Sequence, residues 1–142
     1  MKTILFADDN KSIRKYCQAS FEDEGYRVVL ARDGVEALKA YRTECPDLAI
    51  LDLSMPRVGG MEALERIKKM APDFPVILFT ANDDDCLRDP RATLAVACVE
   101  KSNDLSDLKG IVASTLRWSR SESGEAPLRL GLPPLRKEVG CS

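Results

Sequence analysis

The sequence predicts a parallel α/β sheet with helices on both faces. Short apolar runs alternate along the chain with segments of helical periodicity, which favours parallel strands joined by helices. The run from Pro75 to Thr80 is almost continuously apolar, as expected for a strand that is covered on both faces. The 142 residues, 44% hydrophobic and 31% charged, are typical of one globular domain with a short extension. Right-handed crossovers would order five such strands 2-1-3-4-5.

The apolar runs place the strands, and the periodic segments place the helices between them. The predicted strands are Thr3–Asp8, Tyr26–Ala31, Asp47–Asp52, Pro75–Thr80 and Val96–Glu100. The helices are one that ends at Gly25, then Val35–Glu44, one from Gly60 to just before Ala71, Asp83–Thr93, and Asp104–Leu116. Their predicted inward residues are Ile13, Tyr16, Cys17, Phe21, Val35, Leu38, Tyr41, Met61, Leu64, Ile67, Leu105, Leu108, Ile111, Val112 and Leu116.

The fourth helix is interrupted by Pro90, and a proline inside a helix costs ~3 kcal/mol. We therefore expect that this helix either begins near Pro90 or is short and irregular. From Trp118 the sequence is rich in Pro, Gly and Ser and has no sustained apolar period. This composition predicts a folded domain over residues 1–117 and a flexible tail over 118–142.

Charge and composition exclude several classes of function. The net charge of −2, with no basic stripe, does not favour direct binding of nucleic acid. No apolar run approaches the ~18 residues of a membrane span, and the first residues lack the pattern of a secretory signal. We therefore expect a cytoplasmic protein with no membrane contact.

The side chains available for chemistry are limited by the absence of histidine. Without it, Ser-His, Cys-His and other histidine-based catalysis are excluded. The five cysteines contain no C-x-x-C pair, so neither a zinc site nor a disulfide framework is predicted. We expect reduced thiols, with Cys17 and Cys98 filling the core.

Polar residues follow the predicted strands where those strands end. Asp8 and Asp9 end the first strand, Asp52 the third and Thr80 the fourth, and Lys101 follows the fifth. The carboxyl ends of parallel strands share one edge, and ligands bind there where the strand order reverses. These side chains should therefore meet in one small pocket, with Thr80 and Lys101 on the far side of Asp52.

Such a group has the parts needed to accept a phosphoryl group. Three carboxylates close together require a cation, and an all-oxygen site with room for water suits Mg²⁺. Lys101 supplies a positive charge and Thr80 a hydroxyl donor. Phosphoryl transfer depends mainly on positioning and on stabilising charge at the equatorial oxygens.

The sequence resembles the receiver domain of two-component response regulators. The matching segments are FADDN (6–10), ILDLSMPRVGG (50–60), LFTA (78–81) and VEKS (99–102), and the resemblance covers about Met1 to Leu116. It implies a flavodoxin-like doubly wound fold. It also implies that Asp52 is the phospho-acceptor, that Thr80 and Lys101 contact the phosphoryl group, and that Mg²⁺ is held by Asp8, Asp9, Asp52 and the backbone carbonyl of Ser54.

The resemblance further implies how such a protein works. A histidine kinase or a phosphotransfer protein would donate the phosphoryl group in trans. The receiver would promote its own Mg²⁺-dependent phosphorylation and dephosphorylation at Asp52 without turning over external substrates. With no output domain visible, we expect a stand-alone receiver of the chemotaxis type that acts on a downstream protein partner. A homodimer through the fourth helix, fifth strand and fifth helix is a further expectation.

Three positions depart from the family pattern. Cys98 stands where the family often has an aromatic residue that turns inward on activation, Ser102 follows the lysine in place of a common proline, and Leu94 lies near a usual glycine. These differences predict a modified signalling surface around the fourth helix. They do not alter the phosphorylation site.

Other interpretations of the same residues remain. Singly, each strand-end acid would be explained as a helix cap or a solvated loop residue. The whole domain would also serve as a receiver-like interaction module that signals by binding without phosphorylation. A phosphatase-like hydrolase with Asp52 as nucleophile usually carries a second aspartate two residues later, where this chain has Ser54.

Overall fold

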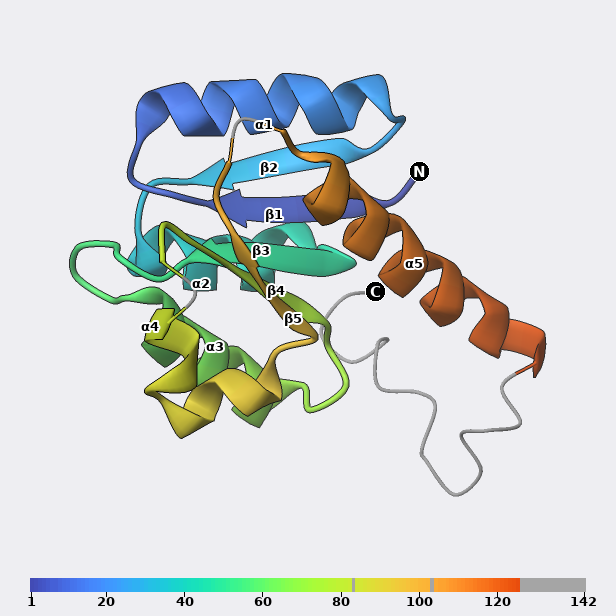
Figure 1. Ribbon diagram of the computed structural model, residues 1–142. Helices are drawn as coiled ribbons and strands as arrows, with labels where there is room; N and C mark the ends of the chain where they lie inside the picture. The colour runs from blue at the N-terminus through green and yellow to red at the C-terminus, as the bar shows by residue number, and fades with distance from the viewer. Residues whose placement is uncertain (83, 103, 126–142) are drawn as a thin grey trace.

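The chain folds into a five-stranded parallel sheet with the strand order β2-β1-β3-β4-β5 (Figure 1). The computed structural model describes residues 1–82, 84–102 and 104–125, with side chains to residue 117. The predicted order and the doubly wound, flavodoxin-like architecture are confirmed. The strands are β1 Thr3–Ala7, β2 Arg27–Ala31, β3 Leu48–Asp52, β4 Val76–Thr80 and β5 Ala97–Glu100. Each is one residue shorter than predicted.

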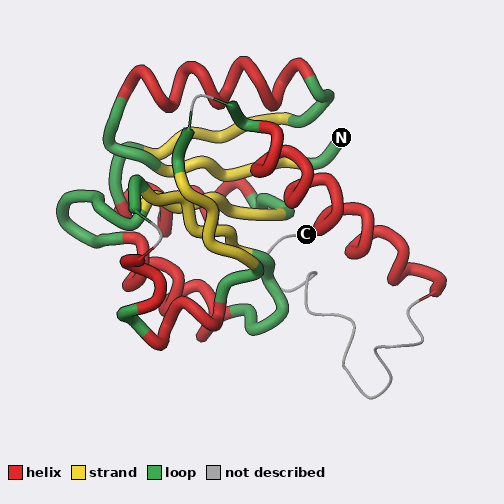
Figure 2. Tube along the Cα trace, in the orientation of Figure 1, coloured by secondary structure: helices red, strands yellow, loops and turns green. Residues whose placement is uncertain are grey.

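Helices cover both faces of the sheet (Figure 2). On one face α1 and α5 pack against the sheet, and on the other α2 and α3 do so. The helices are α1 Lys11–Asp23, α2 Gly34–Glu44, α3 Gly60–Met70, α4 Asp84–Leu87 and α5 Ser106–Glu125, with a 3₁₀ helix η1 over Pro90–Leu94. No helix in the described part of the chain is long and apolar enough to cross a membrane.

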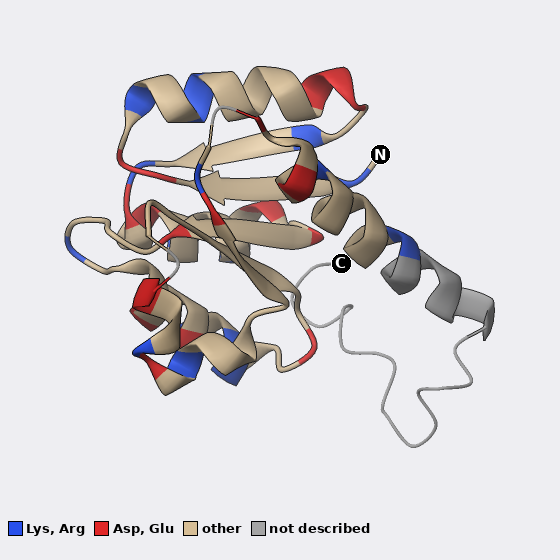
Figure 3. Ribbon diagram, in the orientation of Figure 1, with Lys and Arg blue, Asp and Glu red and all other residues tan. Residues whose placement is uncertain are grey.

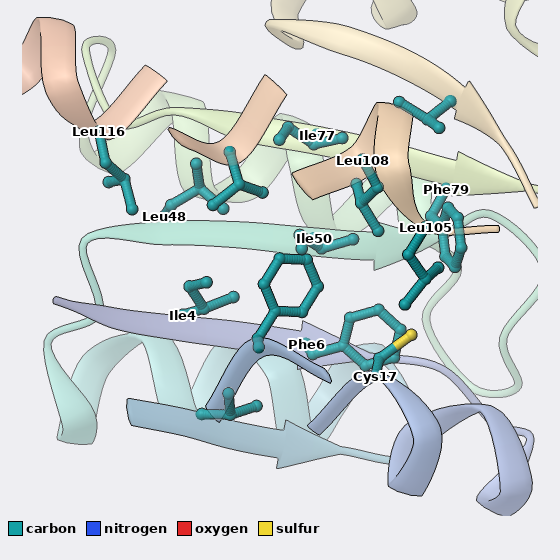
Figure 4. Close-up of a cluster of buried hydrophobic side chains, with 14 residues drawn as sticks. Ile4, Phe6, Cys17, Leu48, Ile50, Ile77, Phe79, Leu105, Leu108 and Leu116 are labelled. Carbon is teal, nitrogen blue, oxygen red and sulfur yellow. The ribbon is translucent and has the colours of Figure 1, made fainter. Parts of the chain in front are cut away.

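Strand alternation divides the apolar side chains between two cores. On the α1/α5 face, Phe6 and Phe79 pack edge to face with ring centroids 6.0 Å apart, in one cluster with Cys17 of α1 and Leu108 of α5 (Figure 4). The central strands β1, β3 and β4 are buried along their whole length. Complete burial of each large apolar side chain contributes about 1.5–3 kcal/mol, so these strands form a rigid centre for their carboxyl ends.

Two predicted inward residues are exposed in the structure. Tyr16 is 50% exposed and Val35 is 40% exposed. In α1 the buried stripe follows Cys17 and Phe21, four residues apart, and Tyr16 lies about 100° away from it around the helix. Val35 lies in the first turn of α2, before the buried Leu38. The stripe on each helix is therefore narrower than the prediction.

The predicted fourth helix is divided into two short pieces. Asp84–Leu87 forms a single turn with no buried residue, and Pro90 begins η1, where Asp89 caps the 3₁₀ helix by accepting from the Arg91 N–H. Proline is tolerated at a first helical position because its missing N–H would have no partner there. A helix therefore does begin at Pro90, as one alternative predicted, and the helical turn before it is short, as the other predicted.

Helix α5 continues to Glu125, beyond its predicted end at Leu116. The segment after Trp118 lacks an apolar period, but its first proline is Pro127, so nothing before that residue removes a helical hydrogen bond. The first part of the predicted tail thus has helical backbone. Residues 126–142 lie outside the described part of the chain, and the domain boundary at 117 stays a prediction.

Candidate functional site: a carboxylate and lysine cluster

The cluster lies at the carboxyl edge of the sheet, where the strand order reverses. Asp8 follows β1, Asp52 ends β3, and Lys101 follows β5. Strands β1 and β3 are neighbours and pair Ala7 with Leu51, which brings the two carboxylates side by side. In Figure 3 acidic (red) and basic (blue) segments lie together near the carboxyl end of β1. The expected convergence is therefore present.

Three carboxylates and one ammonium form the centre of the site. One oxygen from each of Asp8, Asp9 and Asp52 lies within 4.8 Å of the others. Lys101 Nζ lies 2.8 Å from Asp8 Oδ2 and 3.2 Å from Asp52 Oδ1. Asp8 and Asp52 are buried, whereas Asp9 is exposed. Sequence reasoning placed Lys101 beside Asp52 alone, but the structure pairs it with both buried carboxylates.

The protonation of this cluster is strongly perturbed. Burial, together with the nearby charge of Asp8, raises the pKa of Asp52 to about 6, against the lowering effect of Lys101 and of the Ser54 N–H. Burial by itself lowers the pKa of Lys101, but its hydrogen bond and charge interaction with Asp8, followed by those with Asp52, raise it overall. The ammonium is thus charged at neutral pH and partly compensates two crowded carboxylates.

The arrangement fits a hard divalent cation. Asp8 Oδ2 is buried and pairs with the Lys101 ammonium at 2.8 Å, and no further donor among the described residues hydrogen-bonds to it. The other Asp8 oxygen accepts from the backbone N–H of Asn10 at 2.9 Å. Carboxylate oxygens beside an exposed third acid match the preference of Mg²⁺, which keeps several waters.

Thr80 is positioned by its own loop. Its hydroxyl donates to the Asn82 carbonyl and accepts from the Asn82 N–H, both at 3.1 Å. Thr80 is buried at the end of β4, next to Asp52 of β3 in the sheet, because Asp52 pairs with Phe79. The hydroxyl must therefore leave Asn82 before it can contact a group on Asp52.

The loop after β3, residues 53–59, is held closely against the sheet. A Cβ on Gly60 would lie 2.3 Å from the Asp52 carbonyl oxygen, and one on Gly34 would lie 2.1 Å from that of Val58. Arg57 has a left-handed backbone, φ 67°, and its guanidinium bonds the buried Asp33 at 2.7 Å. The loop that carries Ser54 is thus fixed from two sides.

Several of these supporting residues were missed in the sequence. Arg14 of α1 donates to the backbone carbonyl of Asp8 at 2.8 Å, and Arg57 reaches Asp33 across 24 residues. The motif segment FADDN gave a signal for Asn10, which also caps α1 by accepting from Ile13 N–H. No spacing rule relates Arg57 to Asp33, because the contact is made between two loops.

The expectation of reduced cysteines is wrong for Cys86 and Cys98, and also for Cys45, which is disulfide-bonded. Cys86 of α4 and Cys98 of β5 form a disulfide, with Cα atoms 6.7 Å apart. Each cysteine is half-buried, so Cys98 is not an inert core thiol. Cys17 is buried and free as expected, and burial raises its pKa to about 12. Neither the sequence separation of 12 nor the residue types indicated the pairing, since it depends on where α4 rests.

Known proteins with similar sequences include a response regulator and a transcriptional regulatory protein. The chain is 40% identical over 84 residues to the alkaline phosphatase synthesis transcriptional regulatory protein PhoP of Bacillus subtilis, covering 59% of this chain and 35% of that protein. It is 39% identical over 151 residues to the response regulator MprA of Mycobacterium ulcerans, covering 96% of this chain and 62% of MprA. The chain therefore spans less than two thirds of the length of these relatives.

Solved structures with the same fold include two receiver proteins. The response regulator TrrA of Thermotoga maritima, in complex with Mg²⁺–BeF, matches with a TM-score of 0.77 and 36% identity over 80% of this chain and 98% of TrrA. A CheY-like receiver domain protein of Methanospirillum hungatei matches with a TM-score of 0.78 and 28% identity, over 86% of this chain and 98% of that protein. The family model of the response regulator receiver domain matches residues 4–113, and the chain therefore belongs to that family.

Proposed function

We propose that this domain is a phosphorylation-controlled switch in which Asp52 accepts a phosphoryl group. The observation that carries the proposal is the position of Lys101, whose ammonium contacts Asp8 and Asp52 together in a buried acidic cluster. A lone strand-end aspartate would need no such partner. A nucleophilic carboxylate, two further acids and a fixed cation are together the components that phosphoryl transfer requires.

The two oxygens of Asp52 have different surroundings. Oδ1 accepts from the Ser54 N–H at 3.3 Å and faces Lys101 at 3.2 Å. We assign Oδ2 as the attacking atom: it forms a bond to phosphorus while the bond from phosphorus to the donor breaks. Lys101 then stabilises the added negative charge, and Thr80 contacts the new group after its hydroxyl leaves Asn82.

The proposed metal ligands are Asp8, Asp9, Asp52 and the backbone carbonyl of Ser54. A bound Mg²⁺ would neutralise charge on the phosphoryl oxygens during transfer. The buried Oδ2 of Asp8 supports this assignment, because among the described residues it has no partner besides the Lys101 ammonium and can therefore coordinate a cation. TrrA, which was crystallised with Mg²⁺–BeF, is a receiver of the same fold and 36% identical.

The donor acts in trans because this chain has no histidine. A histidine kinase or phosphotransfer protein is the proposed source, and TrrA has been crystallised with the histidine kinase ThkA. We propose that the domain promotes its own Mg²⁺-dependent phosphorylation and dephosphorylation at Asp52 and does not turn over external substrates. It would control a downstream protein in the cytoplasm. PhoP is named a transcriptional regulator, so the absence of direct nucleic-acid contact remains a prediction for this chain.

The test is chemical phosphorylation of the purified protein. With Mg²⁺ and acetyl phosphate, the intact mass should rise by one phosphoryl group, and hydroxylamine should remove it, as expected for an acyl phosphate. Asp52→Asn should abolish labelling. Asp107→Asn, which alters an exposed carboxylate in α5, is the matched control and should label like the wild type.

The remaining outcomes distinguish the alternatives. No adduct on the wild type, with Mg²⁺ in excess and the fold intact by circular dichroism, would overturn the proposal in favour of a module that signals by binding alone. Multiple turnover of phosphomonoesters would instead indicate a hydrolase. Removal of Mg²⁺ with a chelator should prevent labelling, and Asp9→Asn should raise the Mg²⁺ concentration needed for half-maximal labelling.

A further inference from the structure

The single turn α4 has few contacts that hold it on the domain. None of its four residues is buried, and Leu87 is 83% exposed. Its ion pair, Arg88 to Asp85, lies within the same exposed turn and does not reach the sheet. The Asn82 side chain accepts from the Asp84 N–H, which fixes where the turn begins but not where it rests.

The disulfide is the strong connection between this turn and the sheet. Cys86 lies in α4 and Cys98 lies in β5, on the face that carries α2 and α3. Cys98 pairs in register with Leu78 of β4, and Thr80 lies two residues further along β4 on the same face. The bond therefore fastens the turn at the edge of the sheet, close to the strand that carries Thr80.

The segment after α4 has a separate anchor. Arg91 of η1 bonds Asp89 at 2.8 Å and Glu65 of α3 at 3.2 Å. This network holds η1 against α3 without any contribution from Cys86. If the disulfide opened, η1 would stay in place, and the segment 84–88 would be free to leave β5.

We infer that Cys86 and Cys98 are a reversible thiol/disulfide pair, and that their oxidation controls whether α4 can move away from β5. Both sulfurs belong to half-buried residues at the surface, within reach of a small disulfide or a redox protein. None of the four residues of α4 is fully buried, and Cys86 is partly buried against the core on the α2/α3 face. The disulfide through Cys86 is therefore the main connection that fixes the position of the turn.

The oxidation proceeds by thiol–disulfide exchange and needs a disulfide as co-reactant. One cysteine thiolate attacks a sulfur of the oxidant, forming a mixed disulfide and releasing one thiol of the oxidant. The second cysteine thiolate then attacks the sulfur of the first, forming the Cys86–Cys98 bond and releasing the second thiol. Two protein thiols and one external disulfide become one protein disulfide and two external thiols, and a dithiol reductant reverses the step.

The position of the pair gives the reaction a consequence for signalling, which rests on the proposed function. Thr80 must leave Asn82 to contact a phosphoryl group, and Asn82 also caps the turn through Asp84. Movement of the Thr80–Asn82 loop should therefore shift α4. In the oxidised protein the disulfide opposes that shift, so phosphorylation changes the α4 surface less than it does in the reduced protein.

The first experiment maps the bond in the full chain. After oxidation with oxidised glutathione and blocking of free thiols, trypsin should release peptides Met70–Arg88 and Ala92–Lys101 as one cross-linked product, since each contains one cysteine. Dithiothreitol should separate them. A failure to cross-link at any glutathione ratio, or cross-links to other cysteines only, would overturn the inference.

The second experiment measures what the bond does. Amides in segment 84–88 should exchange hydrogen about ten-fold faster after reduction, while η1 changes little, as expected for a locally opening unit. Cys86→Ser/Cys98→Ser is the control: it should exchange like the reduced wild type and should not respond to dithiothreitol. Equal exchange in oxidised and reduced wild type, or a response that persists in the double variant, would contradict the inference.

A third arm separates this inference from the proposed function. Asp52→Asn should show the same cross-link and the same redox-dependent exchange, since neither requires phosphorylation. If the redox response persists while acetyl phosphate leaves the wild type unlabelled, only the proposed phosphorylation is wrong. If labelling occurs and exchange in α4 on addition of acetyl phosphate is the same in oxidised and reduced protein, the link to signalling is wrong.

Discussion

The loop that follows Asp52 and the single turn α4 are held in place by very different contacts. Around Asp52, the loop after β3 is fixed by close backbone contacts at Gly34 and Gly60 and by the buried Asp33. In α4 none of the four residues is buried, and a disulfide joins the turn to β5. The first region is closely packed, whereas α4 has little packing to lose by moving. A rigid centre beside a weakly held segment is the arrangement that a conformational switch needs.

The region around Asp52 should be most sensitive to loss of the Lys101 ammonium, which contacts both buried carboxylates. Lys101→Met leaves Asp8 and Asp52 buried without a positive partner, and we expect a loss of about 3 kcal/mol of unfolding free energy at pH 8 without metal. The raised pKa of Lys101 means that its contribution is fully present at this pH and is lost only as the pH rises through that pKa.

Urea denaturation with and without Mg²⁺ measures this effect. The metal should restore part of the lost stability in the variant, because it supplies the missing positive charge. Lys109→Met, which removes an exposed pair with Glu24 at 3.7 Å, is the matched control and should change stability by less than about 0.5 kcal/mol. Similar losses in both variants would mean that the buried cluster is not the stabilised centre.

The close backbone contact should be the next most sensitive feature. A methyl group on Gly60 meets the Asp52 carbonyl at 2.3 Å, so Gly60→Ala should cost about 2 kcal/mol through overpacking and should weaken Mg²⁺ binding. Gly110→Ala in α5 has no atom within 4 Å of the new methyl and should stabilise by about 0.5–1 kcal/mol. Thermal unfolding of the pair, with Mg²⁺ titration, would refute the close-packing argument if both variants behaved alike.

Asp52, the proposed phospho-acceptor, should reduce the stability of the metal-free protein. The pKa of Asp52 is raised to about 6, so the folded state holds its proton more tightly than the unfolded state. Stability should therefore fall as the pH rises from about 4 to about 6, and Asp52→Asn should remove this slope and add about 1–2 kcal/mol at pH 8. Unfolding measured across this range checks the sign, and a destabilised Asp52→Asn would show that the site is not crowded.

The smallest change in stability is expected for a substitution in α4. Leu87 is 83% exposed, so Leu87→Ala should change the free energy of unfolding by less than about 0.5 kcal/mol. The same substitution at the buried Leu64 should lower the free energy of unfolding by about 2–5 kcal/mol. Guanidinium titrations of the two variants measure the contrast, and a large loss at Leu87 would indicate that α4 packs more firmly than the structure shows.

Local sequence patterns were sufficient for the central part of the fold. The strands from β1 to β5 were placed within one residue because buried parallel strands are short and apolar, and because right-handed crossovers leave few topologies. The gathering of Asp8, Asp9, Asp52 and Lys101 followed from the same rule, since strand ends share an edge. A helical or strand period, and the position of a residue at the end of a strand, can be recognised in the sequence without coordinates.

Contacts between loops and between short elements were decided only by the tertiary structure. The Arg57–Asp33 pair, the Cys86–Cys98 bond and the bridging of two carboxylates by Lys101 have no signature in spacing. Each of these contacts depends on how irregular segments pack against the formed sheet. In such segments the direction of a side chain, or a shift of a few ångströms, determines which residue it contacts. The sequence thus determined the sheet, its edge and the residues gathered there, because burial and periodicity are local properties. Which of the gathered side chains contact one another depended on packing over the whole fold.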